Sequence, residues 1–168
     1  SNPQLPAFVA PPTRIRPMQA ANFETIVNTL DIPPEQILHY AELDNGPVWQ
    51  AFQLDSAASV LALDAARVRW PEFRSLGFIG AHAEGAECQF EVRMLAPSSG
   101  MSEDPITGSL NSALAHWLQA EGRLEQPVMI AQGTNINRHG RVSMHPVDST
   151  SVMIGGQTHI LIEGSLRL

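Results

Sequence analysis

The chain has 168 residues, of which 43% are hydrophobic, and its formal net charge is -7. This length and hydrophobic content suffice for one substantial core, so neither disulfides nor a structural metal is needed for stability. The acidic balance argues against a nucleic-acid partner, and the absence of lysine excludes covalent attachment of pyridoxal phosphate. Because no apolar run approaches membrane-spanning length and no secretory signal is visible, we expect no membrane partner and a cytoplasmic location.

The first half of the chain predicts short helices and one hairpin. Asn22 is a residue type that favours the start of a helix. Two strand-like runs, 40–43 and 48–54, flank the segment 44–47, whose Asp-Asn-Gly-Pro sequence is typical of a hairpin turn. We expect short helices or turns over 22–30, 31–35, 56–63 and 64–70.

The second half predicts mainly strands and one long helix. The helix is expected over 109–121, where Leu110, Leu114 and Leu118 recur at helical spacing before Gly122. Together these elements indicate an α+β domain whose long helix is mostly buried. The strands are expected over 77–81, 87–95, 128–131, 141–144, 151–154 and 159–163.

The most informative segment is 103–109, which reads Glu-Asp-Pro-Ile-Thr-Gly-Ser. It places the carboxylate of Asp104 a few residues ahead of a helix that starts near Gly108 and Ser109. The first turn of a helix presents unpaired N–H groups and the positive end of the helix dipole, which suit a carboxylate or phosphate oxygen. The same residue types are also ordinary capping and turn chemistry, so the local pattern leaves both interpretations open.

Other residues that carry chemistry indicate no second site. The six histidines are dispersed, without paired cysteines or a His-Glu-x-x-His spacing, so no metal is expected. Cys88 follows a strand alternation and is expected to be a small buried hydrophobe. Arg93 lies on the other face of that strand, where the pattern predicts either a surface ion pair or a brace for the loop that contains Glu103. Gly155 and Gly156 suggest a bulge or turn.

In their order and spacing these segments resemble the PhzF family of phenazine-biosynthesis-like isomerases. The strongest match combines Arg-Met-Leu-Ala-Pro at 93–97 with the motif at 103–109, and a weaker match covers Asn-Gly-Pro-Val-Trp at 45–49. The resemblance covers most of the chain. It implies the diaminopimelate epimerase fold, in which a barrel-like, mostly antiparallel sheet wraps around a central helix.

The resemblance also implies a domain that this sequence does not contain. Family members are built from two similar halves, and the first carries a Ser-Glu-Thr-Ala-Phe-like segment with the catalytic glutamate, which does not occur here. Residues 1–20, which are rich in proline, resemble the interdomain segment, and residues 21–168 resemble the C-terminal domain. We therefore expect one domain of a two-domain isomerase, inactive without its N-terminal domain, and relatives suggest a homodimer.

The implied chemistry is cofactor-independent proton transfer on a small cyclic amino or hydroxy acid. Asp104 would be the catalytic residue of this half, as an acceptor for the substrate's hydroxyl or amine and as a proton shuttle. Gly108 and Ser109 would bind the substrate carboxylate, and Thr107 belongs to the same substrate-binding set. Ile106 stands where many relatives have a small residue, which implies a narrower or differently shaped pocket. No cofactor or metal is expected.

Two other function classes stay open at this point. One is a related epimerase or racemase, although the two-cysteine version of that chemistry cannot be built from a single cysteine. The other is a non-catalytic module that binds a small molecule at the same site. The sequence does not identify the substrate in any of these cases.

Overall fold

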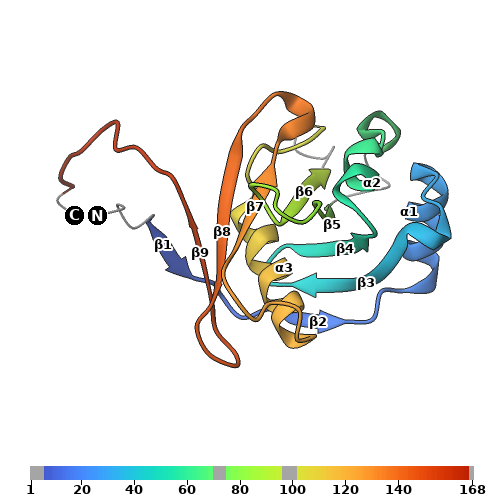
Figure 1. The fold of residues 1–168 in the computed structure, drawn as a ribbon, viewed down its shortest axis with the longest axis horizontal. Coiled ribbons are helices and arrows are strands. Elements are labelled where there is room, and N and C mark those ends of the chain that lie inside the picture. The colour runs from blue at the N-terminus through green and yellow to red at the C-terminus, as the bar shows by residue number, and fades with distance from the viewer. Residues whose placement is uncertain (1–5, 70–74, 96–101, 167–168) are drawn as a thin grey trace.

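The structure, a computed structural model, describes residues 6–69, 75–95 and 102–166. They form one sheet with the strand order β1-β9-β8-β7-β6-β5-β4-β3-β2 (Figure 1). Two short strands from the beginning of the chain therefore form the opposite edges of the sheet. The strands are β1 (Ala7–Val9), β2 (Arg14–Arg16), β3 (Ile37–Asp44), β4 (Val48–Leu54), β5 (Leu76–Ala81), β6 (Phe90–Leu95), β7 (Val128–Gln132), β8 (Gly140–Pro146) and β9 (Val152–Gly156).

The sheet is mostly antiparallel, as the resemblance implies. Only the pairs β4–β5 and β6–β7 run parallel. Parallel neighbours need a crossover connection, and each of these pairs is joined through a helix. The helix α2 (Ala57–Ala62) connects β4 with β5, and α3 (Gly108–Ala120) connects β6 with β7.

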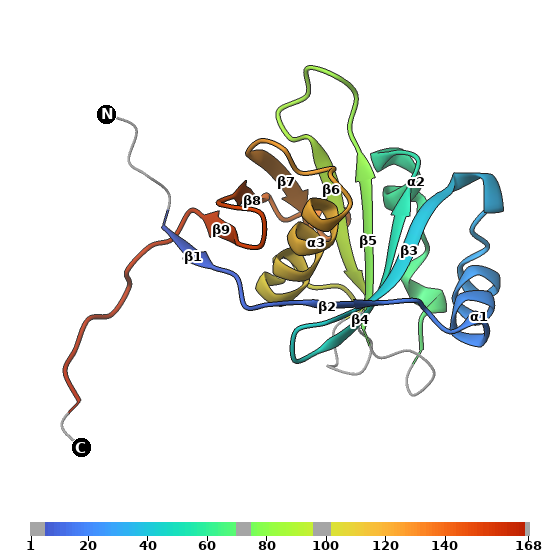
Figure 2. The same ribbon diagram turned by 90° about the horizontal axis from the view of Figure 1, so that it is seen from below.

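Helix α3 lies on the inner face of the sheet, which curves around it (Figure 2). It packs on β3, β4, β8 and β9, which explains why its apolar residues do not form a narrow stripe. The sheet does not close, because β1 and β2 do not pair with each other. The expected barrel-like shape is therefore only a strong curvature. The buried residues of the helix are Leu110, Asn111, Ser112, Ala113, Leu114, Ala115, Trp117 and Leu118.

A second core lies on the outer face of the sheet, beneath α1 (Ala20–Leu30) and α2. A row of aromatic rings runs from its buried Phe52 and Phe78, whose centroids lie 5.6 Å apart, to the partly buried Phe23 and the exposed Tyr40, whose centroids lie 4.3 Å apart. Such offset pairs add to the stability gained by burial alone. No helix in the described ranges combines the length and the apolar character needed to cross a membrane. The described residues also form the 3-10 turns η1 (Pro34–Gln36), η2 (Ala65–Arg67) and η4 (Thr134–Ile136).

The structure confirms the hairpin, the long helix and five of the six expected strands of the second half, with shifted ends. The expected strand 159–163 is wrong, because this segment is exposed coil that extends away from the sheet. Asn22 does not begin α1, which starts at Ala20 after Gln19. The helix expected over 64–70 is only the turn η2, and residue 70 lies outside the described residues. The strands β1 and β2 were not expected.

Candidate functional site

A buried ion pair joins β6 to the segment 102–107, which we call the site loop. Arg93 Nη2 lies 2.7 Å from Glu103 Oε2, and Arg93 Nε lies 3.1 Å from both carboxylate oxygens. The two side chains are 2% and 1% exposed. Arg93 Nη1 also donates to the carbonyl oxygens of Val60 and Leu63, at 3.1 and 2.6 Å. The guanidinium thus connects β6, the end of α2 and the site loop.

The surface ion pair expected as one alternative for Arg93 is therefore wrong, and the structural brace is confirmed. Helix α2 packs over β5 and β6 on the outer face and removes this part of the strand from water. A buried charge without its partner costs several kcal/mol, so the pair holds Glu103 firmly in place. Asp104 follows directly, and its amide donates to the carbonyl of Met94 at 3.3 Å. Residues 96 and 97 of the resemblance pattern lie outside the described residues.

Asp104, the expected catalytic residue, is half-buried and oriented by Thr107. The Thr107 hydroxyl donates to Asp104 Oδ2 at 2.7 Å and accepts a hydrogen bond from Gln132 Nε2 at 3.0 Å. Thr107 itself is 7% exposed. Because both bonds are made inside the protein, the geometry shows Thr107 acting on Asp104 rather than presenting a hydroxyl to solvent.

Gln132, at the end of β7, is the residue that organises this loop. Its side chain is fully buried, and Nε2 also donates to the carbonyl of Asp104 at 3.1 Å. Its Oε1 accepts from the Thr107 amide at 3.2 Å and from Asn111 Nδ2 at 2.7 Å. We assigned Gln132 no role from the sequence. Its position beside Gly133 at a strand end was the only available signal, and that signal did not reveal which way the side chain points.

Helix α3 starts at Gly108, four residues after Asp104. The amide groups of Gly108 and Ser109 have no acceptor among the described residues, as expected for the first helical turn. Asn45, in the turn between β3 and β4, steadies this end by donating to the Ser109 carbonyl at 2.8 Å. A Cβ on Gly108 would meet no protein atom within 4 Å. The fold therefore leaves open space in front of this backbone.

A cavity of about 470 Å³ lies in front of the start of α3. Its lining is mainly apolar and combines Ile106 and Gly108 with residues of β1 and β9, among them Phe8 and Ile154. A pocket of this size with few polar groups is typical of a site for a small molecule. The exposed Ile106 side chain lies at its edge, where the resemblance implied a narrower or differently shaped pocket.

Gly155 and Gly156 also line this cavity, and the bulge or turn expected there is wrong. Both belong to the regular strand β9, where Gly155 pairs with Ala7. A Cβ on Gly155 would lie 2.8 Å from Ser143 Oγ and 3.0 Å from the carbonyl oxygen of Pro6. Glycine is thus needed for the close approach of β1, which forms one wall of the cavity.

Two further observations concern Cys88 and the residue types that bind metals. Cys88 is buried, as expected, and burial raises the pKa of its thiol. Within residues 6–69, 75–95 and 102–166, His, Cys, Asp and Glu side chains form no group of three or more that could hold a metal ion.

Comparison with known proteins agrees with this architecture. The family model described as phenazine biosynthesis-like protein, PhzC-PhzF, matches residues 5–164. The chain therefore belongs to this family. Among curated proteins it is similar to antisense-enhancing sequence 1 of Schizosaccharomyces pombe, with 29% identity over 94% of this chain and 57% of that protein.

Solved structures show the same fold. A PhzF-family phenazine biosynthesis protein of Bacillus anthracis matches with a TM-score of 0.70 and 14% identity, covering 90% of this chain and 56% of that one. A predicted epimerase from Pseudomonas aeruginosa matches with a TM-score of 0.65 and 15% identity, covering 94% and 58%. The chain thus has the PhzF and diaminopimelate epimerase-like fold, and it spans slightly more than half the length of these relatives.

Proposed function

We propose that this chain is the C-terminal domain of a cofactor-independent isomerase that moves a proton on a small cyclic amino or hydroxy acid. In this proposal Asp104 accepts a hydrogen bond from the substrate's hydroxyl or amine and shuttles the proton. The amides of Gly108 and Ser109 bind the substrate carboxylate at the positive end of α3. Membership of the PhzF family supports this reaction class, and the proton-abstracting glutamate would come from the N-terminal domain of the family.

The observation that carries the proposal is the way the site loop is held. Thr107 fixes Asp104 Oδ2 at 2.7 Å, and Gln132 in turn fixes Thr107 and the Asp104 backbone. A carboxylate that is oriented in advance suits proton transfer because little reorganisation is needed during the reaction. Of the predicted site residues, Gly108 lines the apolar cavity, whereas Asp104, Thr107 and Ser109 do not. If the site loop served only to cap α3, the fold would not need the buried Gln132 to hold Asp104 through Thr107.

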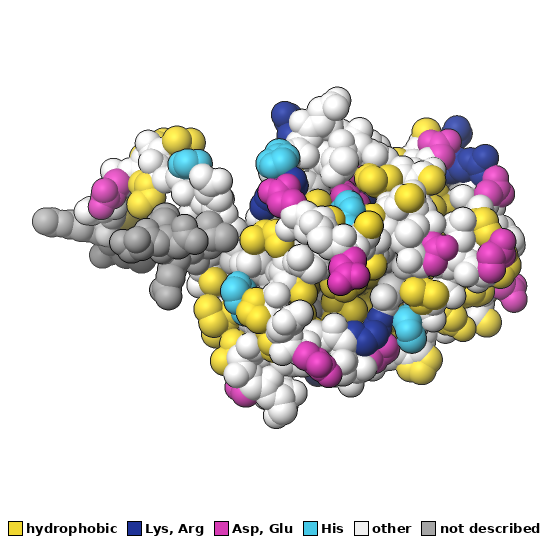
Figure 3. Space-filling view, in the orientation of Figure 1, with side chains coloured by type: hydrophobic (Ala, Val, Ile, Leu, Met, Phe, Trp, Pro, Cys, Tyr) yellow, Lys and Arg dark blue, Asp and Glu magenta, His cyan; other side chains and the backbone are white. Residues whose placement is uncertain are grey.

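Exposed apolar residues around the cavity support a partner domain on this side. Phe8 and Val9 on β1 are 50% and 64% exposed, and Phe8 lines the cavity. The segment 157–166 leaves β9 and carries further aliphatic side chains into solvent (Figure 3). Large apolar side chains grouped in this way typically mark an interaction surface. We assign this surface to the N-terminal domain, which would close the cavity over the substrate.

Complementation tests the proposal directly. The chain is produced together with the N-terminal half of a PhzF-family relative, and cyclic amino acids and hydroxy acids are incubated with the pair in deuterated water. We expect solvent deuterium to appear on a ring carbon, detected by NMR, only when both halves are present. Exchange at a single stereocentre with racemisation would instead favour the epimerase alternative. Binding of substrate without any exchange, under conditions where the halves associate, would favour a binding module.

A further inference from the structure

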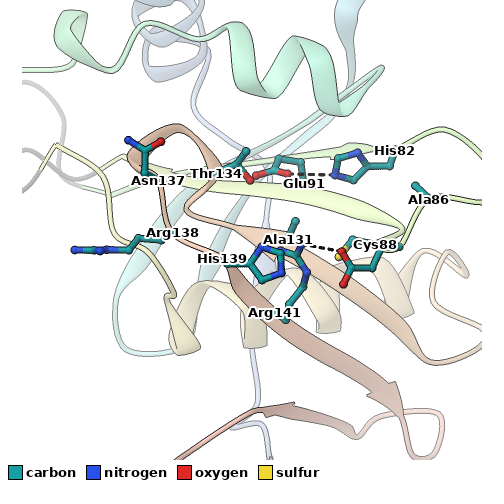
Figure 4. A pocket seen from close by; sticks show the side chains of 11 residues that line it. His82, Ala86, Cys88, Glu91, Ala131, Thr134, Asn137, Arg138, His139 and Arg141 are labelled. Carbon is teal, nitrogen blue, oxygen red and sulfur yellow. Dashed lines mark hydrogen bonds and ion pairs between the residues drawn. The ribbon is translucent and has the colours of Figure 1, made fainter.

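A second cavity lies on the outer face of the sheet, opposite the face that α3 covers (Figure 4). Its volume is about 450 Å³. Ala131 of β7 forms the floor, between Glu91 of β6 and Arg141 of β8, and the three residues are direct neighbours across the strands. Because the alanine side chain is short, it leaves a hollow between the Glu91 carboxylate and the Arg141 guanidinium. The strands that carry these two residues are two strand spacings apart, roughly 10 Å.

Each of these two charged residues has one buried polar atom without a partner. Glu91 is 1% exposed, and its Oε2 lies 3.2 Å from His82 Nε2. Its Oε1 finds no hydrogen-bond donor in the described part of the chain. Arg141 donates from Nη2 to Glu87 at 2.8 Å and from Nη1 to the Gly140 carbonyl at 3.0 Å, but its Nε has no acceptor among the same residues.

One of these unpaired atoms is a hydrogen-bond acceptor and the other is a donor. A buried carboxylate oxygen lacks a donor on one side of the cavity, and a buried guanidinium N–H lacks an acceptor on the other. Leaving such groups unpaired destabilises a fold, and native proteins rarely do so without a bound partner or water.

Two further charged side chains line the cavity: Glu87, which pairs with Arg141, and Arg138. Figure 4 shows Glu91 beside His82 on one side, and Arg141 with His139 and Cys88 on the other. The hydrogen bond with Glu87 raises the pKa of Arg141, so the guanidinium stays charged. Burial raises the pKa of Cys88, so a neutral thiol lines the wall.

We infer that this cavity binds a free α-amino acid, with the ammonium group at the Glu91 carboxylate and the carboxylate at the Arg141 guanidinium and the His139 ring. An amine alone would pair with only the acid, and a carboxylate alone with only the base. The cavity at the start of α3 also has Arg141 in its lining, so the two sites are neighbours. The second site uses neither Asp104 nor the amides of α3, and it does not depend on the proposed isomerase activity.

The test is an NMR titration of the 168-residue chain with each of the twenty amino acids at 20 mM, with methylammonium and acetate as half-ligands. We expect at least one amino acid to shift the Ala131 methyl signal and the His82 ring signals saturably. Each half-ligand alone should bind at least tenfold more weakly. If no amino acid shifts these signals, or if methylammonium and acetate bind equally well, the cavity holds only water or simple ions and the inference is wrong.

Substitutions locate the ligand. Glu91→Gln should weaken binding by roughly tenfold or more, because it removes the charge that the ammonium group meets. Ala131→Leu should abolish binding by filling the hollow, and it keeps the test decisive if the Glu91 variant does not fold. Glu84→Gln, an exposed neutralisation outside the lining, is the matched control. Asp104→Asn should leave this binding unchanged, whereas loss of binding in that variant would place the ligand at α3 instead.

Discussion

The buried pair of Arg93 and Glu103 provides the sharpest test of how the site is built. Glu103→Gln keeps the shape of the side chain but removes the negative charge that faces the guanidinium. Because both side chains are almost completely buried, Arg93 would be left as an uncompensated buried cation, which costs about 3–5 kcal/mol. Arg93 keeps its bonds to the carbonyls of Val60 and Leu63, so we expect the lower end, about 3 kcal/mol.

Thermal and urea unfolding of the 168-residue chain measure this loss. For a domain of this size, about 3 kcal/mol corresponds to a decrease in Tm of roughly 6–12 °C. The double variant Arg93→Met with Glu103→Leu should recover most of the stability, because it removes both charges and keeps apolar volume. A loss below about 1 kcal/mol for Glu103→Gln, the range of surface pairs, would refute the reasoning. So would a double variant that is less stable than Glu103→Gln.

Three further predictions concern the site and the acid stability of the fold. Gly108→Ala should leave the free energy of unfolding unchanged or raise it by up to about 1 kcal/mol. It should weaken at least tenfold the binding, measured by calorimetry, of a cyclic amino acid that the complementation assay identifies; unchanged affinity would exclude this backbone from the anion site. Gln132→Met removes four buried hydrogen bonds and should cost about 2–4 kcal/mol in urea unfolding, and a near-neutral result would mean that solvent replaces them. Hydrogen bonds from Thr150 and Ser151 lower the pKa of Asp148 below its ordinary value of 3.8. The ionised carboxylate therefore contributes fully to folding stability above that pH, and this contribution is lost as the pH falls through the lowered pKa. Asp148→Ala should therefore show a shallower loss of Tm on acidification below about pH 4, and an identical pH profile would count against this assignment.

Helix α3 and the β3–β4 hairpin could be predicted because each follows a sequence pattern that is local to its own residues. The spacing of Leu110, Leu114 and Leu118 fits α3 whatever packs around it, and the Asp-Asn-Gly-Pro turn sets the β3–β4 hairpin locally. The nearness of Asp104 to the start of α3 at Gly108 could also be predicted, because only three residues separate them in the sequence. Local pattern and final structure agree where the determining contacts are themselves local.

The rest depends on contacts between distant segments. Arg93 lies on a strand face that looks exposed by alternation, and only the packing of α2 on that face buries it. Gln132 meets Thr107 across 25 residues of sequence, so no local pattern could show the bond. The edge strands β1 and β2 have only three residues each, all exposed, and proline-rich surroundings that do not resemble strands. The segment 159–163 has strand-like residues but no neighbouring strand among the described residues.

Solvent-deuterium incorporation by the Asp104→Asn variant tests the central claim most directly. The variant is combined with the N-terminal half of a PhzF-family relative, beside the unsubstituted chain and the Glu84→Gln control. We predict that Asp104→Asn folds normally and binds the substrate identified by complementation within about tenfold of the parent, yet incorporates no deuterium into it, while the control remains fully active. Deuterium incorporation at the parent rate by Asp104→Asn would contradict the account and remove Asp104 from the reaction.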